Sequence, residues 1–188
     1  MEDERPKSLD GEAWETDERS YVFEERIGRG LEHKERGNDA FKAELYALAL
    51  RRYARALHHA EFDVMQMHDF SEKHKDDVYA VAVPAKLNYI ACVLKMRDEN
   101  IEVPPVNADD EEEPRTPLDH CDALVEEMLK AVKEAAHFEM PSTALAKNRA
   151  KISFRRGQLL RERGDLPRAK EALNEAHRLG ASSSSVRD

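Results

Sequence analysis

Apolar residues recur along this chain three and four positions apart in several separate stretches, which is the spacing of one helix face. The clearest stripe comprises Leu45, Leu48, Ala49, Tyr53, Ala56 and Leu57. The same spacing predicts six helices, at 30–43, 45–60, 76–96, 118–138, 141–163 and 166–179. A composition rich in Ala, Glu, Leu, Lys and Arg, with few Gly and aromatic residues, agrees with an all-α protein.

The stretches between these helices are polar or carry helix-breaking residues. We expect residues 1–12 to be disordered, 13–29 to form a leading helix or ordered arm, and 61–75 to be an extended link. The segment 97–117 holds four prolines and an acidic run, so it is predicted to be a loop. The Ser-rich end of the chain, 180–188, is expected to be a flexible tail.

Because only a residue or two separates the helices predicted at 30–43 and 45–60, these helices must fold back as a hairpin. Three hairpins are predicted, at about 30–60, 76–138 and 141–179, within one domain that spans 13–179. Pro84 is expected to start or kink its helix. Pro141 suits a first helical turn, and Gly164 with Asp165 suits the turn of the last hairpin.

The first and last hairpins carry small and apolar residues at the same spacing. Positions 8, 20, 24 and 27, counted from residues 30 and 150, are Gly37, Ala49, Tyr53 and Ala56, and Gly157, Ala169, Leu173 and Ala176. Self-similarity with a period near 34 residues is typical of tetratricopeptide (TPR) repeats. The chain thus resembles a TPR protein, which implies three hairpins stacked in a right-handed superhelical solenoid with a concave groove. Ile90 departs from the pattern, since position 8 of the middle hairpin is not small.

Charge is unevenly distributed over the 188 residues. The net charge of −9 argues against general nucleic-acid binding. Residues 97–119 carry a net charge of −7, whereas residues 145–180 carry +6. An acidic protein with one basic face suits an acidic partner, and a solvated helix surface is the alternative interpretation.

Several features bear on the compartment. No apolar run approaches the roughly 20 residues of a membrane span, and the acidic first residues are unlike a signal or transit peptide. Cys92 and Cys121 are expected to be buried thiols. We therefore expect a monomeric cytoplasmic protein, with the nucleus as a second location, that needs no cofactor.

Five polar residues lie on the predicted first helices of the three hairpins, which are Lys34, Asn38, Asn88, Lys151 and Arg155. Residues four apart share a helix face. The five side chains would therefore converge in the groove as three cations and two amides. Lys supplies a point charge, Asn supplies amide donors and Arg can donate two hydrogen bonds to one carboxylate. Such a set suits a C-terminal aspartate, which carries two carboxylates close together.

This constellation resembles the two-carboxylate clamp of chaperone-binding TPR domains. Lys34–Asn38 matches K-x-x-x-N of the first repeat, Asn88 the single Asn of the second, and Lys151–Arg155 the K-x-x-x-R of the third. Flanking stretches such as HKERGNDAFKAELYALALRRYARAL and LNYIACVLKM resemble the large FKBP-type immunophilins (peptidyl-prolyl isomerases). The resemblance implies a co-chaperone that binds the C-terminal Glu-Glu-Val-Asp of heat-shock protein 90, or less readily of heat-shock protein 70. Lys34, Asn38 and Asn88 would hold the terminal carboxylate, and the other two residues acidic side chains.

The sequence also bears on other classes of function. No nucleophile elbow, phosphate loop or nucleotide fingerprint occurs, so no enzyme is predicted. The eight histidines lack metal-site spacing and are expected to be scattered on the surface, and the run Asp109–Glu113 lacks the pattern of a calcium loop. Two alternatives stay open, a TPR scaffold for an unrelated partner and the non-catalytic targeting half of an FKBP-type prolyl isomerase.

Overall fold

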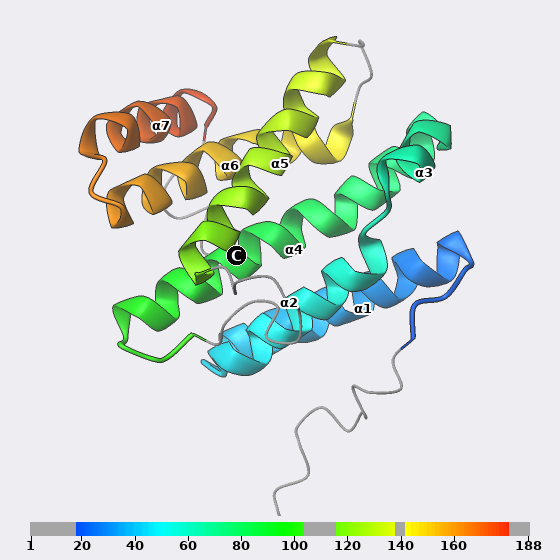
Figure 1. Ribbon diagram of the computed structural model, residues 1–188, viewed down its shortest axis with the longest axis horizontal. Helices are drawn as coiled ribbons and strands as arrows, with labels where there is room; N and C mark the ends of the chain where they lie inside the picture. Colours follow the sequence, from blue (N-terminus) through cyan, green and yellow to red (C-terminus); the bar gives the residue numbers. More distant parts are fainter. Residues whose placement is uncertain (1–17, 104–115, 138–141, 181–188) are drawn as a thin grey trace, which may run out of the picture.

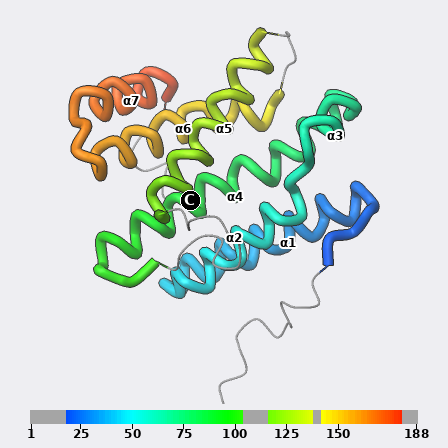
Figure 2. The backbone as a smooth tube through the Cα atoms, viewed as in Figure 1, coloured from blue at the N-terminus to red at the C-terminus, as the bar shows by residue number. Residues whose placement is uncertain are grey.

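The computed structural model describes residues 18–103, 116–137 and 142–180, and these residues are all-helical, as predicted. They form seven helices and no strand (Figures 1 and 2). The helices are α1 (Phe23–Lys42), α2 (Tyr46–Ala60), α3 (Val64–Asp69), α4 (Glu72–Asp98), α5 (Pro117–His137), α6 (Thr143–Glu162) and α7 (Leu166–Arg178). The predictions for residues 1–12, the acidic run Asp109–Glu113, Pro141 and the tail beyond Gly180 lie outside the described residues.

Helices α1 and α2 form the first hairpin, and Gly37 determines how closely they pack. The chain reverses through Glu44, whose φ of 61° is left-handed. A Cβ added at Gly37 would lie 2.7 Å from Cε1 of Tyr53, whose side chain is only 1% exposed. The small residue at position 8 therefore lets the tyrosine ring lie directly against the α1 backbone.

Helix α1 is longer than the helix predicted at 30–43. The leading segment joins it from residue 23 without a break, and Glu24 and Glu25 in its first turn favour a helix start there. Gly30 lies inside this helix, where the absence of a side chain lets α1 approach α2, since a Cβ at that position would lie 3.2 Å from the carbonyl oxygen of Ala56. The expected leading helix thus becomes the first turns of α1.

The prediction of an extended link at 61–75 is wrong. Helix α3 interrupts this segment, and a capping box in which Asp63 and Gln66 exchange hydrogen bonds begins it. An aromatic cluster packs the segment against α1, since Phe23 lies 5.5 Å from Phe62 and 5.1 Å from Phe70 between ring centroids. Aromatic contacts between residues distant in sequence therefore order a stretch that looks polar.

Arg26 of α1 also stabilises the packing of α1 against the end of α2. Its buried guanidinium donates from Nε to the carbonyl oxygen of His59 at 2.9 Å and from a second nitrogen to that of Glu61. It also lies 3.6 Å above the ring of Phe62. The side chain thereby satisfies carbonyl groups at the end of α2, where a helix favours a cation.

Helix α4 crosses the middle of the molecule and contacts α1, α2, α5 and α6 (Figure 1). It begins after Ser71, which caps it, so Pro84 lies inside the helix and does not start it. By length and composition alone, α4 is the one described helix that could cross a membrane. Because 61% of its apolar window is buried in the fold, it has the character of a core helix.

Helices α6 and α7 form the last hairpin through a turn at Gly164, whose φ is +79°, and Asp165, which caps α7. A Cβ at Gly157 would lie 2.7 Å from Cγ of Leu173, which parallels the contact in the first hairpin. In the middle pair, Ile90 is fully buried at the corresponding position, and the α4 and α5 backbones approach each other at fewer places.

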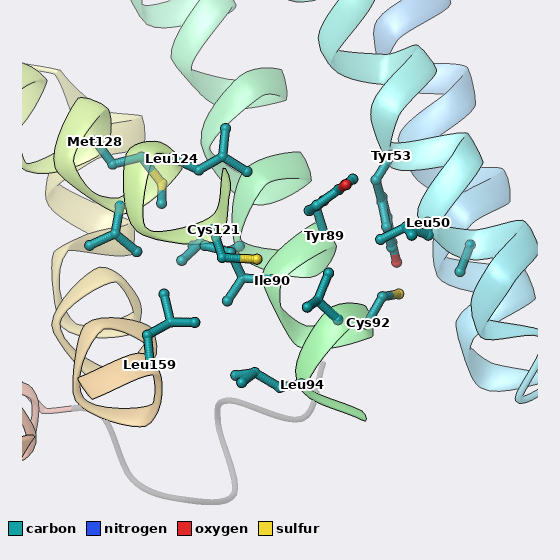
Figure 3. Close-up of a cluster of buried hydrophobic side chains, with 14 of the residues drawn as sticks. Leu50, Tyr53, Tyr89, Ile90, Cys92, Leu94, Cys121, Leu124, Met128 and Leu159 are labelled. Carbon is teal, nitrogen blue, oxygen red and sulfur yellow. The ribbon is translucent and has the colours of Figure 1, made fainter. Parts of the chain in front are cut away.

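The core lies on both sides of α4. Figure 3 shows Tyr53 and Leu50 of α2 facing Cys92 of α4, and Cys121 of α5 facing the opposite side of the same helix. Both cysteines are free and fully buried, as predicted. Burial raises the pKa of each thiol to about 12.

Candidate functional site

The five residues predicted as a clamp lie together around one cavity of about 140 Å³ between α1, α4 and α6. Three further residues, Pro84, Leu87 and Asn148, complete its wall. The lining includes three cations and, within the described part of the chain, no acidic residue. The cavity is therefore a small, strongly cationic hollow.

Helical spacing explains how three elements supply five groups. Lys34 and Asn38 are one turn apart on α1, and Lys151 and Arg155 are one turn apart on α6. Asn88 lies on α4, which packs against both of these helices. The side chains can reach one cavity because α1 and α6 both pack against α4, which runs between them (Figure 2).

The two amides of the site are hydrogen-bonded to each other and to a tyrosine. Asn88 donates from Nδ2 to Oδ1 of Asn38 at 2.8 Å, and the Tyr53 hydroxyl donates to the same oxygen at 2.9 Å. Both lone-pair directions of that oxygen are thereby used. The Nδ2 group of Asn38 remains as the part of this amide that can donate to a ligand.

Arg155 is the most desolvated cation of the site. Burial lowers the pKa of its guanidinium to about 10, so it stays charged at neutral pH while lacking much of its hydration. Its NH1 donates to Oε1 of Gln158 at 2.7 Å, which orients the group along α6. A cation held in low-dielectric surroundings interacts strongly with an anion that reaches it.

Sequence reasoning did not single out Asn148 as part of this cavity. It is 8% exposed, and its Nδ2 donates to the Ala144 carbonyl oxygen at 2.8 Å. It lies three residues before Lys151, so the same face rule would have placed it there. Pro84 likewise lies one turn before Asn88 on α4.

A larger groove of about 880 Å³ adjoins the cavity and shares Asn38, Asn88 and Arg155 with it. It continues towards the C-terminal ends of α1 and α4 and mixes apolar and charged residues. Its other lining residues are Phe41, Lys42, Tyr53, Ala91, Leu94, Lys95, Asp98 and Gln158. The cationic cavity is therefore one end of this longer groove and not an isolated cavity.

The expectation that the histidines are scattered on the surface is wrong for two of them. His33 and His59 are buried, with stacked rings 5.5 Å apart, and NH1 of Arg52 lies 3.1 Å from Nδ1 of His33. Their contacts join α1 to α2. Among the described residues, no group of three or more His, Cys, Asp or Glu side chains could hold a metal ion.

Comparison with known proteins adds no further constraint on the site. No protein-family model matches the chain, and no solved structure matches it significantly. The class that fold and site define is thus an all-helical protein of packed hairpins with a cationic cavity between three of its helices.

Proposed function

We propose that this chain is a TPR-type binding module that holds the C-terminal carboxylates of a chaperone, without catalysis of its own. The partner we favour is the terminal Glu-Glu-Val-Asp of heat-shock protein 90, with that of heat-shock protein 70 second. The observation that carries the proposal is the convergence of Lys34, Asn38, Asn88, Lys151 and Arg155 on one cavity.

Most of the hydrogen-bonding groups that line the cavity are donors, which favours an anion. Lys34, Lys151 and Arg155 can donate but not accept. The acceptor oxygen of Asn38 already receives two hydrogen bonds, so its amide has donors left to offer. A carboxylate matches such a set, whereas a carboxamide would bring N–H groups that meet other donors.

The roles of individual residues follow from the family resemblance. Lys34, Asn38 and Asn88 would hold the terminal main-chain carboxylate, and Lys151 and Arg155 would hold acidic side chains. The adjoining groove offers space for the residues that precede the terminus. Its mixture of apolar and charged walls suits a segment that contains both valine and glutamate.

The arrangement of the hairpins supports a TPR solenoid. In the first and last hairpins a glycine at position 8 faces the residue at position 24, and the two contacts have the same form. Helices α1, α4 and α6 line the cavity, as the first helices of successive TPR hairpins would line a concave groove. The irregular middle pair, with Ile90 at position 8, is the weakest point of the resemblance.

The test is a calorimetric titration of the chain with a chaperone-tail peptide in free-acid and amidated forms. We expect the free acid to bind with micromolar affinity that weakens with salt. Lys151→Ala or Lys34→Ala should lower affinity about tenfold or more, since each charge-assisted bond contributes roughly 1.5–3 kcal/mol. Lys147→Ala is the matched control, because Lys147 lies one turn before Lys151 but does not line this cavity.

Three outcomes would contradict the proposal. Equal binding of free-acid and amidated peptides would show that the cavity does not recognise a carboxylate. Equal losses of affinity in Lys147→Ala and Lys151→Ala would show that general charge attraction, and not the cavity, causes the effect. Partners retained from cell extract after neutralisation of Lys151 and Arg155 would instead favour a scaffold for an unrelated protein.

A further inference from the structure

We infer that Tyr53, which lies on α2 outside the three helices that supply the charged groups, is a positioning residue that orients the Asn38 amide for carboxylate binding. The inference rests on the proposed function and adds a residue to its site. It starts from the hydrogen bonds at Oδ1 of Asn38 and from the packing of the tyrosine ring.

The ring of Tyr53 is almost completely buried. Its side chain is 1% exposed and lies in the core between α2 and α4 (Figure 3). Gly37, the residue before Asn38, lets the ring lie against α1, with ring atoms 2.7–3.1 Å from where a Cβ would be. The hydroxyl therefore has a fixed place, 2.9 Å from Oδ1 of Asn38.

The hydroxyl acts on the amide as a proton donor. Burial raises the pKa of the Tyr53 phenol, so the group keeps its proton at neutral pH. The phenol and the Asn88 amide both donate to Oδ1. These two bonds fix the amide with its oxygen towards α2 and α4, which leaves Nδ2 as the group available to a ligand.

Loss of the hydroxyl would change the polarity of the site and not only its rigidity. An amide can rotate by half a turn and exchange its oxygen for its nitrogen at nearly the same place. With one of its two donors gone, Asn38 could turn its oxygen towards the cavity and repel a carboxylate. A carboxamide terminus would not suffer this repulsion, so discrimination between the two termini should fall.

The experiment is Tyr53→Phe, which retains the ring and removes the hydroxyl. We expect affinity for the free-acid peptide to fall about threefold to tenfold, as for the loss of one neutral hydrogen bond, with little change for the amidated peptide. Tyr46→Phe is the control, because Tyr46 is also a buried tyrosine of α2 but lines neither the cavity nor the groove. It should leave both affinities unchanged.

A double-mutant cycle separates positioning from a general structural effect. In an Asn38→Ala background, Tyr53→Phe should no longer change affinity, since the amide that it orients is gone. Equal losses in both backgrounds, or wild-type affinity and discrimination in Tyr53→Phe, would overturn the inference. The Asn38 side-chain amide resonance of the ligand-free protein should also shift in Tyr53→Phe, and an unchanged resonance would count against it.

The failure of the proposed function would look different. In that case the unmodified chain itself would bind free-acid and amidated peptides equally, and the role of Tyr53 would fall with it. A chain that discriminates strongly, together with a Tyr53→Phe variant that discriminates as strongly, would overturn the positioning role alone.

Discussion

Replacement of Gly37 by alanine tests whether the close contact between α1 and α2 holds the first hairpin together. In an open helix position this change is favourable, because alanine has the higher helix propensity by about 1 kcal/mol. At Gly37 the new methyl group would lie 2.7, 2.9 and 3.1 Å from three ring carbons of Tyr53. Propensity and packing therefore predict opposite signs.

The size of the overlap decides between them. Ordinary contacts begin at 3.4 Å, so the nearest ring carbon must retreat by about 0.7 Å. The ring is rigid and 1% exposed, and its hydroxyl is bonded to Asn38, so it has no easy route away. Overpacking of this kind costs about 1–3 kcal/mol. Since the ring has no easy route away, the cost should lie in the upper part of this range, at about 2–3 kcal/mol. After the propensity gain of about 1 kcal/mol, Gly37→Ala should lower the free energy of unfolding by about 1–2 kcal/mol.

Two other glycines calibrate the measurement. Nothing lies within 4 Å of a Cβ built at Gly28, so Gly28→Ala should raise the free energy of unfolding by about 0.5–1 kcal/mol. A Cβ at Gly157 would lie 2.7 Å from Cγ of Leu173 and 3.3 Å from the carbonyl oxygen of Ala169, but the half-buried Leu173 side chain can change rotamer. Gly157→Ala should therefore fall between the other two variants.

Urea unfolding followed by far-ultraviolet circular dichroism measures all three variants under one condition. The expected order of stability is Gly28→Ala, wild type, Gly157→Ala and then Gly37→Ala. If Gly37→Ala were as stable as Gly28→Ala, the two helices would be free to separate without loss. The glycine would then not set their distance.

The remaining predictions concern buried groups away from the cavity. Arg26→Met retains the apolar contact but leaves carbonyl groups such as that of His59 without their donor, so the free energy of unfolding should fall by about 1–3 kcal/mol in urea; no loss would contradict the cap. Burial raises the pKa of Cys92 and Cys121 to about 12, so roughly one thiol in ten thousand is ionised at pH 8. Iodoacetamide should therefore modify neither cysteine in the folded chain and both in denaturant, as mass spectrometry can check. Asp76→Ala should cost about 1 kcal/mol in thermal unfolding, because its carboxylate accepts hydrogen bonds at the start of α6, and Asp76→Asn should cost less; equal losses would show that the charge is what matters.

Helical periodicity predicted much of this fold because helices such as α1, α2, α5 and α7 each have one apolar face. The predicted helices at 45–60 and 166–179 agree with α2 and α7 to within a residue or so. Periodicity failed at α3, where it would have needed several turns to be visible. That helix is six residues long and is held by an aromatic cluster whose members are distant in sequence.

Buried polar groups were the second kind of feature that the sequence could not reveal. His33, Arg26 and His59 look like ordinary surface residues of amphipathic helices. The pairing of α1 with α2 buries them, since it brings Arg26 to the His59 carbonyl oxygen and Nδ1 of His33 to within 3.1 Å of NH1 of Arg52, and stacks the two imidazole rings. Such partners are known only once the helices have been paired.

The site residues were easier to predict than the distances between them. A spacing of four residues places Lys34 and Asn38 on one face of their helix, and likewise Lys151 and Arg155 on one face of theirs. Nothing in that spacing says that Tyr53, from a fourth helix, shares an acceptor with Asn88. This contact depends on how α2 packs against α1, which the glycine at position 37 controls.

The separation of α4 and α6 at the site depends in part on a contact well away from the cavity. Oδ1 of Asp76, near the start of α4, accepts hydrogen bonds from Oγ of Ser142 at 2.7 Å and from the backbone N–H of Ala144 at 3.1 Å. Asn88 follows this junction by about 18 Å along α4 and Lys151 by about 13 Å along α6, at about 1.5 Å per residue. Both α4 and α6 run from this junction to the cavity. The Asp76 carboxylate that caps α6 therefore helps to determine where Asn88 faces Lys151 and Arg155.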